Sequence, residues 1–198
     1  MTIQSDALVT GPDGVTRCAW AAATALEQHY HDTEWGRAVV GEHDLFERIV
    51  LEAFQAGLSW RLVLERRDAL RAAFHGFDVD RVAAMTDEEL AERMTDPSII
   101  RNRAKIFATR SNARATVALR EDPCGDLHEL IWSFQPAEHT PPTNLSEYVA
   151  TTPESVAMAK ALKNRGFTFV GPVTAYAMMQ AVGLVDDHVV GCHRSAAR

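Results

Sequence analysis

Four residues of the types that bind metal ions lie in two pairs near opposite ends of the chain. Twelve residues separate Cys18 from His31, and three separate His188 from Cys192. Thiolate and imidazole suit a tetrahedral Zn²⁺, and four protein ligands leave no open position, so the metal would be structural and would join the two ends. Spacing alone favours the other interpretation, buried cysteines and surface histidines, because eight His and three Cys make chance pairs easy.

Aromatic residues crowd the first of these pairs. Trp20, Tyr30 and Trp35 lie within a few positions of it, and Trp60 follows further along the chain. Core packing is the better explanation for any single Trp. A metal that gathers the first pair would nevertheless bring the three neighbours together, and such a cluster suits a flat or cationic ligand.

A carboxylate interrupts the apolar face of one expected helix. Over residues 43–56, Leu45, Ile49 and Glu52 recur at helical spacing. Burial there is costly unless the group is paired or functional, and it would raise the pKa of Glu52. The sequence fits a second interpretation equally well, in which the Glu52 side chain leans to the helix edge or pairs with Arg48, four residues earlier.

Charge is distributed unevenly along the sequence. The net charge of −7 argues at face value against a nucleic-acid partner. Residues 97–120 contain six basic side chains and no acidic one, and residues 155–185 contain three basic side chains and no acidic one. The rest of the chain therefore has a net charge of −16. A basic run is usually a solvated face, but two acid-free stretches in an acidic protein also indicate a polarised surface.

The second of these stretches contains a tight connection between two expected helices. Gly166 and Gly171 bracket it, and Pro172 opens the following helix. Exposed backbone N–H groups and a helix N-terminus suit a phosphate, although an ordinary helical hairpin explains the same pattern.

The elements that position these residues are helical, so we expect an all-α fold. Apolar periodicity, capping boxes and the pairing of Pro with Gly at helix ends predict helices over residues 43–56, 61–74, 86–94, 99–120, 127–134, 152–166 and 172–183. Only residues 167–170 have a strand-like composition, and this run is too short to found a sheet.

Length and composition indicate how many domains these elements form. The chain has 198 residues, 46% of them hydrophobic, which is typical of one large domain or two small lobes. We expect a flexible arm over residues 1–16, one domain over 17–192 and a tail over 193–198. The absence of a membrane span or secretory signal and the sparse cysteines predict a protein of the reducing cytoplasm, without disulfides.

Several local strings, in order and at suitable spacing, resemble the 3-methyladenine DNA glycosylase I enzymes of the helix-hairpin-helix superfamily. The strings that carry this resemblance are Cys18-Ala19-Trp20, Tyr30-His31-Asp32-Thr33-Glu34-Trp35-Gly36, Gln55-Ala56-Gly57-Leu58-Ser59-Trp60, Arg165-Gly166-Phe167-Thr168-Phe169-Val170-Gly171 and Asp187-His188-Val189-Val190-Gly191-Cys192. Ala53 and Phe54 replace small or polar residues that usually follow the Glu in the family, and one further departure matters more. Glu27 stands where a Tyr usually precedes the Tyr-His pair by three residues.

The resemblance implies a two-lobed fold with one structural zinc per chain. Its ligands would be Cys18, His31, His188 and Cys192. It also implies a base pocket in which Glu52 is catalytic and accepts hydrogen bonds from a flipped purine, with walls formed by Trp20, Tyr30, Trp35 and Trp60. Gln55, Gly57 and Leu58 would probe the gap left by the flipped nucleotide, and the hairpin with Gly166, Phe167 and Gly171 would bind DNA phosphate through its backbone.

The implied activity is base-excision repair of double-stranded alkylated DNA. A purine alkylated at N3 is positively charged and leaves as a neutral base, so cation binding provides selectivity. No Lys follows the hairpin where related lyases carry one, which predicts hydrolysis without strand cleavage. The family implies a bacterial, cytoplasmic monomer that is associated with the nucleoid when it acts on DNA, without membrane contact. Two alternatives remain: a catalytically silent, zinc-containing module that binds DNA damage, and a protein-interaction domain without DNA contact.

Overall fold

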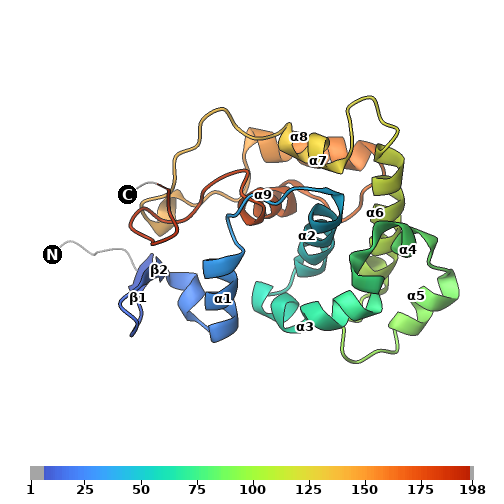
Figure 1. Ribbon diagram of the computed structural model, residues 1–198, viewed down its shortest axis with the longest axis horizontal. Coiled ribbons are helices and arrows are strands. Elements are labelled where there is room, and N and C mark those ends of the chain that lie inside the picture. Colours follow the sequence, from blue (N-terminus) through green and yellow to red (C-terminus); the bar gives the residue numbers. More distant parts are fainter. Residues whose placement is uncertain (1–6, 197–198) are drawn as a thin grey trace.

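The protein is predominantly helical, as expected from its sequence. A computed structural model describes residues 7–196 (Figure 1). The helices in chain order are α1 (Ala25–Thr33), α2 (Glu42–Gln55), α3 (Trp60–Ala73), α4 (Val79–Ala84), α5 (Asp87–Arg93), α6 (Arg103–Leu119), α7 (Leu127–Trp132), α8 (Pro153–Asn164) and α9 (Pro172–Ala181), and 3-10 turns cover Ala19–Ala22, His75–Phe77 and Leu145–Glu147. Within the described residues, no helix has the length and apolar character needed to cross a membrane.

The seven helices predicted from sequence are confirmed, with ends that differ by a few residues. Their starts follow from local chemistry, because a side-chain oxygen at the N-cap accepts a hydrogen bond from a backbone N–H of the first turn. Thr86 and Asp126 form reciprocal capping boxes with Glu89 and Glu129. Pro172 occupies the first turn of α9, where its missing N–H is not needed.

Two short helices were not predicted, although each carries a start signal. Thr24 caps α1 and accepts a hydrogen bond from the backbone N–H of Glu27, and Asp78 caps α4 in the same way. Both helices lack a long apolar repeat, because α1 is rich in polar residues and α4 spans only six residues. The capping residues were the signal available in the sequence.

Parts of the segments expected to be an arm and a tail form main-chain hydrogen bonds where the structure describes them. Strands β1 (Leu8–Thr10) and β2 (Thr16–Cys18) form an antiparallel hairpin over part of residues 1–16. The C-terminal segment docks against it, because the backbone N–H of His193 donates to the carbonyl of Thr16 at 2.8 Å. These main-chain hydrogen bonds order segments that have little apolar periodicity. Residues 1–6 and 197–198 lie outside the described range.

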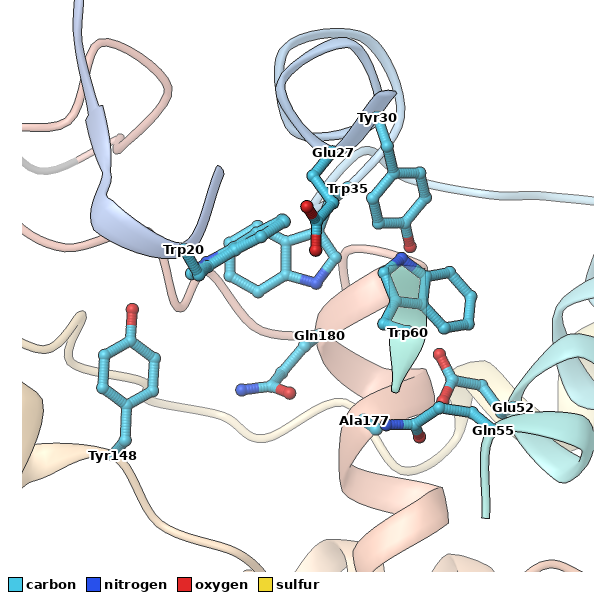
Figure 2. Close-up of a pocket in the computed structure, with 10 residues that line it drawn as sticks. All are labelled: Trp20, Glu27, Tyr30, Trp35, Glu52, Gln55, Trp60, Tyr148, Ala177 and Gln180. Atoms are coloured by element: carbon cyan, nitrogen blue, oxygen red, sulfur yellow. The ribbon is translucent and has the colours of Figure 1, made fainter. Parts of the chain in front are cut away.

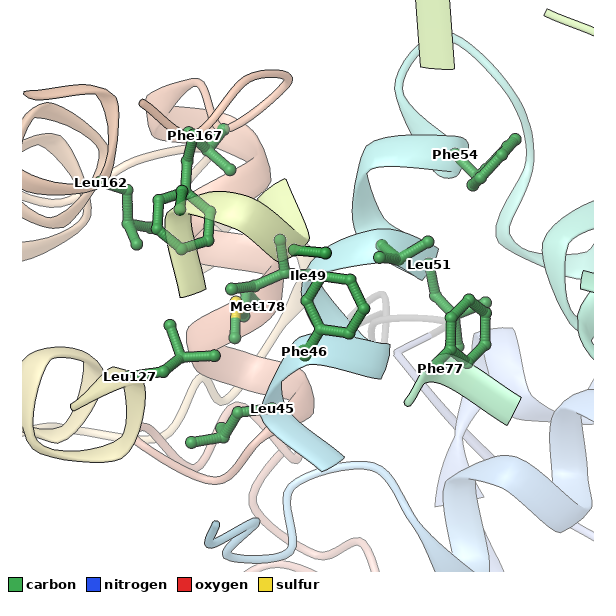
Figure 3. Packing of buried hydrophobic residues seen from close by; sticks show 14 of the residues in the cluster. Leu45, Phe46, Ile49, Leu51, Phe54, Phe77, Leu127, Leu162, Phe167 and Met178 are labelled. Carbon is green, nitrogen blue, oxygen red and sulfur yellow. The ribbon is translucent and has the colours of Figure 1, made fainter. Parts of the chain in front are cut away.

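Two hydrophobic clusters form the core. The larger surrounds α2, whose residues from Leu45 to Phe54 are mostly buried, and Figure 3 shows Phe46 and Ile49 of α2 close to Met178 of α9. The smaller joins α1, β2 and the C-terminal segment. Trp60, at the start of α3, packs against both clusters. A central helix buried on most sides therefore carries Glu52 toward the boundary between the two clusters.

A buried lysine fixes the end of this central helix. The Lys105 ammonium donates hydrogen bonds to the carbonyl oxygens of Phe54 and Ala56, at 2.8 and 2.6 Å. Lys105 is 5% exposed and comes from α6. A cation at a helix C-terminus is favourable, and here it also satisfies carbonyls that the helix leaves unpaired. Lys105 thereby holds the turn that follows Gln55.

We predict that Lys105→Met lowers the free energy of unfolding by about 2–4 kcal/mol, because two carbonyls lose their donor. Denaturant titration measures this value. The matched control is Arg101→Met, which removes the same charge from an exposed position in the loop before α6 and should change stability by less than about 0.5 kcal/mol. Equal, small effects of the two changes would contradict the assigned role.

Candidate active site and metal centre

The four expected metal ligands meet in a buried cluster. Cys18 ends β2, His31 lies in α1, and His188 and Cys192 lie in the segment after α9. Their ligand atoms all lie within 4.8 Å of one another. Cys192 Sγ is 3.4 Å from His31 Nε2 and 3.8 Å from His188 Nδ1. A tetrahedral Zn²⁺ places sulfur and nitrogen ligands about 3.5 Å apart, so the cluster has suitable dimensions to hold such an ion.

The surrounding hydrogen bonds leave the ring nitrogens at the cluster free to act as ligands. His31 Nδ1 lies 2.8 Å from a carboxylate oxygen of Asp32, and His188 Nε2 lies 3.3 Å from the carbonyl of Trp35. Both partners are acceptors, so these outer nitrogens carry the protons and the inner ones present lone pairs. Arg17 holds Asp32 in place at 2.9 Å. This arrangement is typical of histidines that bind a metal.

One of the two thiols, that of Cys192, favours the thiolate form. A hydrogen bond from the Cys18 thiol lowers the pKa of the Cys192 thiol below its ordinary value, although burial opposes the shift. Thiolate is the form that binds metal. Within the described residues, a buried cluster of two histidines and two cysteines with these ligand distances can therefore hold a metal ion.

The cluster brings the aromatic residues together. Trp20 and Trp35 meet edge to face with ring centroids 5.1 Å apart, and the Trp35 ring lies 4.5 Å from that of His188. Tyr30 and Trp60 form a second aromatic pair at 5.2 Å. A close approach of the backbone is required here, because a Cβ on Gly36 would lie 2.8 Å from His188 Nε2.

These two aromatic pairs wall a pocket of about 360 Å³ (Figure 2). It lies at the boundary of the two hydrophobic clusters, where Trp60 contacts both. Its lining residues are Trp20, Glu27, Tyr30, Trp35, Glu52, Gln55, Trp60, Tyr148, Ala177 and Gln180. The volume and the aromatic walls suit one flat heterocyclic ligand.

Glu52 lies at this pocket without a partner. Its side chain is buried, and within residues 7–196 it makes no hydrogen bond or ion pair. Arg48 is the neighbour with which the sequence allowed it to pair, but its guanidinium bonds Glu34 at 2.8 Å. Burial raises the pKa of the Glu52 carboxyl to about 8, although the charge of Arg48 opposes the rise. The free protein therefore holds this carboxyl mainly protonated at neutral pH.

A second polar group of the pocket also lacks a partner. The Trp60 indole Nε1 is buried and donates to no acceptor in the described part of the chain. By contrast, the Gln180 amide is fixed, because its Nε2 donates to the Asp187 carboxylate at 2.6 Å. A buried donor and a buried acceptor that are both unpaired favour a ligand with complementary groups.

The turn after α2 lies beside the pocket. Gln55 lines the pocket, and the backbone N–H of Leu58 donates to the carbonyl of Gln55 at 2.7 Å. Gly57 has a φ of 77°, a conformation that glycine adopts without strain. The Leu58 side chain is 38% exposed. The expected DNA-probing residues thus form one short turn with an exposed apolar tip.

The hairpin between α8 and α9 is anchored to α6. The buried Asn112 side chain accepts a hydrogen bond from the Thr168 backbone N–H at 2.8 Å and donates to its carbonyl at 3.2 Å. Phe167 is buried in the larger cluster, so its side chain serves packing. Gly171 caps α9 with φ −68°, and a Cβ there would meet nothing within 4 Å. The backbone at Gly171 is therefore open to a ligand.

The acid-free stretches expose less charge than their sequence indicates. Arg110, Arg120 and Arg165 form ion pairs with acidic residues distant in sequence, and Lys105 is buried. Within these two stretches, the basic side chains that are exposed and form no ion pair with the described residues are Arg101, Arg103, Arg114, Lys160 and Lys163. Folding therefore neutralises much of the charge polarity, because tertiary contacts bring acids from other segments beside these stretches.

Comparisons with known proteins agree with this geometry. The family model described as methyladenine glycosylase matches residues 20–195. DNA-3-methyladenine glycosylase 1 of Escherichia coli (strain K12) is 48% identical over 181 residues, which cover 89% of this chain and 95% of that protein. DNA-3-methyladenine glycosylase of Haemophilus influenzae is 43% identical over 182 residues, which cover 89% of this chain and 96% of that protein.

Solved structures give the same result. A crystal structure of 3-methyladenine DNA glycosylase I has a TM-score of 0.86 at 44% identity and covers 90% of this chain and 99% of its own. A structure of the Staphylococcus aureus 3-methyladenine DNA glycosylase I, solved to explain 3-methyladenine recognition, has a TM-score of 0.86 at 29% identity. The match covers 92% of this chain and 97% of the other. On the evidence of its sequence, fold and site, this chain belongs to the methyladenine glycosylase family.

Proposed function

We propose that this protein removes 3-methyladenine from alkylated duplex DNA by hydrolysing the N-glycosidic bond, without cleaving the strand. The observation that carries the proposal is a buried carboxyl without a protein partner, placed among aromatic rings in a pocket large enough for one base. Such a carboxyl is costly in the free protein and becomes favourable when a cation reaches it. The names of the relatives support the same substrate.

The chemistry of the pocket fits this base. A purine methylated at N3 carries a positive charge and is flat, so the Trp20–Trp35 and Tyr30–Trp60 pairs offer it ring faces and edges. Glu52 accepts a hydrogen bond from the exocyclic amino group, and Trp60 Nε1 donates to a ring nitrogen. The base must leave the helical stack to reach these groups. Ordinary adenine lacks the charge that offsets the burial of Glu52.

Binding and bond cleavage both involve the charge on Glu52. The approaching cation lowers the pKa of Glu52, so the carboxyl releases its proton to solvent as the base binds and becomes a carboxylate. When the glycosidic bond breaks, its electron pair moves to the base, which leaves neutral, and positive charge develops on the sugar. Glu52 and the DNA phosphates stabilise that charge while water adds to C1′ and releases a proton to solvent.

Strand cleavage requires an amine that attacks the sugar. Among the described residues that line the pocket, none is a lysine. Lys160 and Lys163 lie on α8, before the hairpin, and Lys105 is bound to backbone carbonyls. These placements support hydrolysis by water as the reaction.

Two elements are proposed to contact DNA. The turn with Gln55, Gly57 and Leu58 lies beside the pocket and would enter the gap left by the flipped nucleotide. The hairpin over residues 166–171 would bind a phosphate through its backbone N–H groups and the N-terminus of α9. Phosphate contacts of this kind position the protein and carry no sequence information.

We further propose that the metal at Cys18, His31, His188 and Cys192 is one structural Zn²⁺. The four protein ligands leave no position for substrate, so the ion would supply folding free energy and join the chain ends. The family resemblance of the sequence supports a monomer that acts on nucleoid DNA in the cytoplasm.

Glu52→Gln should reduce the rate of 3-methyladenine release from methylated duplex DNA by about 10²–10³-fold, because the amide keeps the shape but not the charge. Chromatographic assay of the free base measures this rate. Glu88→Gln is the matched control, because Glu88 is exposed on α5, and it should keep the rate of the unmodified protein. A fully active Glu52→Gln variant would contradict the assigned role. An unmodified protein that binds abasic DNA but releases no base would be a silent damage-binding module.

Elemental analysis of the unmodified protein should find about one zinc ion per chain. Cys192→Ala should remove most of it and lower the thermal midpoint, because a ligand and the link between the chain ends are lost. Cys124→Ala changes an exposed cysteine and should retain both zinc and stability. Metal-replete protein with well under one zinc ion per chain would refute a structural zinc.

Gly171→Ala should lower affinity for duplex DNA by about 5–20-fold if a phosphate approaches this backbone, because a methyl group then lies between them. The protein alone has room for the methyl group at an ordinary φ, so its thermal midpoint and its binding of free 3-methyladenine should not change. DNA affinity that is unaffected in this variant would show that phosphate binds elsewhere.

A further inference from the structure

The pocket contains a second carboxylate, from Glu27. In Figure 2 its side chain points from α1 into the pocket, close to Trp35. This is the main position at which the sequence departs from the family's usual pattern. The structure thus places the departure in the wall of the base pocket, on a different helix from Glu52.

The orientation of Glu27 differs from that of comparable glutamates in this chain. Glu27 stands three residues after the N-cap Thr24, as Glu89 stands after Thr86 and Glu129 after Asp126. Glu89 and Glu129 bend back and accept hydrogen bonds from the N-cap backbone N–H groups. Glu27 makes no such bond among the described contacts, so helix capping does not account for its side-chain position.

One carboxylate oxygen of Glu27 is fixed, and the other is free. The Thr24 hydroxyl donates to Oε2 at 2.8 Å. Within residues 7–196, Oε1 accepts no hydrogen bond. The hydroxyl therefore orients the carboxylate while leaving an oxygen available to a ligand.

The electrostatic balance of the pocket is one-sided. Its described lining includes two carboxyl groups and no basic residue. Arg48 and Arg67 are not among the lining residues, and both bond to Glu34. Carboxylates combined with aromatic rings favour a cationic ligand over a neutral ligand of the same shape.

We propose that Glu27 is a specificity-determining residue that selects bases carrying a positive charge. The inference rests on the proposed function and adds a residue to it. The base is cationic before the glycosidic bond breaks and neutral afterwards, so Glu27 attracts the substrate more strongly than the product. Its contribution therefore belongs to substrate binding and not to the cleavage step.

The test compares a charged substrate with an uncharged isostere. Steady-state release of 3-methyladenine from methylated duplex DNA gives KM and kcat for the charged base. The dissociation constant of a duplex carrying 3-methyl-3-deazaadenine reports binding of an uncharged base with the same outline. Glu27→Gln removes the charge and keeps the acceptor for Thr24, Glu27→Asp keeps the charge, and Glu88→Gln is the control for the loss of one distant charge.

Glu27→Gln should raise KM by about 5–30-fold and leave kcat within about twofold, while the dissociation constant of the uncharged duplex stays within about twofold. The KM of Glu27→Asp should lie between those of Glu27→Gln and the unmodified protein. Glu88→Gln should have the KM and kcat of the unmodified protein. These outcomes together support the proposal.

An unchanged KM in Glu27→Gln would overturn the proposal. An equal loss on the uncharged duplex would also overturn it, because Glu27 would then act through shape. If the unmodified protein releases no 3-methyladenine, the proposed function itself fails. If the unmodified protein and the Glu27→Gln variant both release the base with the same KM, only the role of Glu27 fails.

Discussion

The contact between the two ends of the chain is the constraint on which the rest of the site depends. Cys18 and His31 come from the first strands and helix, and His188 and Cys192 come from the last described loop. Their meeting draws Trp20, Tyr30 and Trp35 to one side of α2 and creates the smaller hydrophobic cluster. These aromatic residues line the pocket beside Glu52, where burial raises the pKa of its carboxyl to about 8.

The protein combines a tightly bonded frame with a pocket whose polar groups are unsatisfied. Lys105 fixes the end of α2, Asn112 fixes the hairpin, and the second nitrogens of both metal-cluster histidines are hydrogen-bonded. In the pocket, by contrast, Glu52 and Trp60 Nε1 lack partners in the described chain. The frame holds these groups apart from one another, so that a base of the right shape and charge can satisfy both.

Much of this site could be predicted from the sequence, because the strings of cysteines, histidines and aromatic residues are local and specific. The Glu52 prediction followed from helical periodicity, which placed a carboxyl on an apolar face. Charge was harder to interpret: the basic runs indicated a polarised surface, yet Arg120 and Arg165 are neutralised by Asp80 and Asp122. Such pairs join residues distant in sequence, so composition along the chain cannot reveal them.

The sequence by itself determined the helical fold class and most helix positions, because periodicity and capping are properties of neighbouring residues, and the resemblance of its local strings implied the metal-cluster residues and the aromatic walls of the pocket. Only the tertiary structure decided that Arg48 pairs with Glu34 and leaves Glu52 alone, that Phe167 packs in the core, and that Glu27 turns into the pocket and does not cap its helix. Each of these outcomes depends on which groups meet in space, and burial and partners arise only when distant segments pack together.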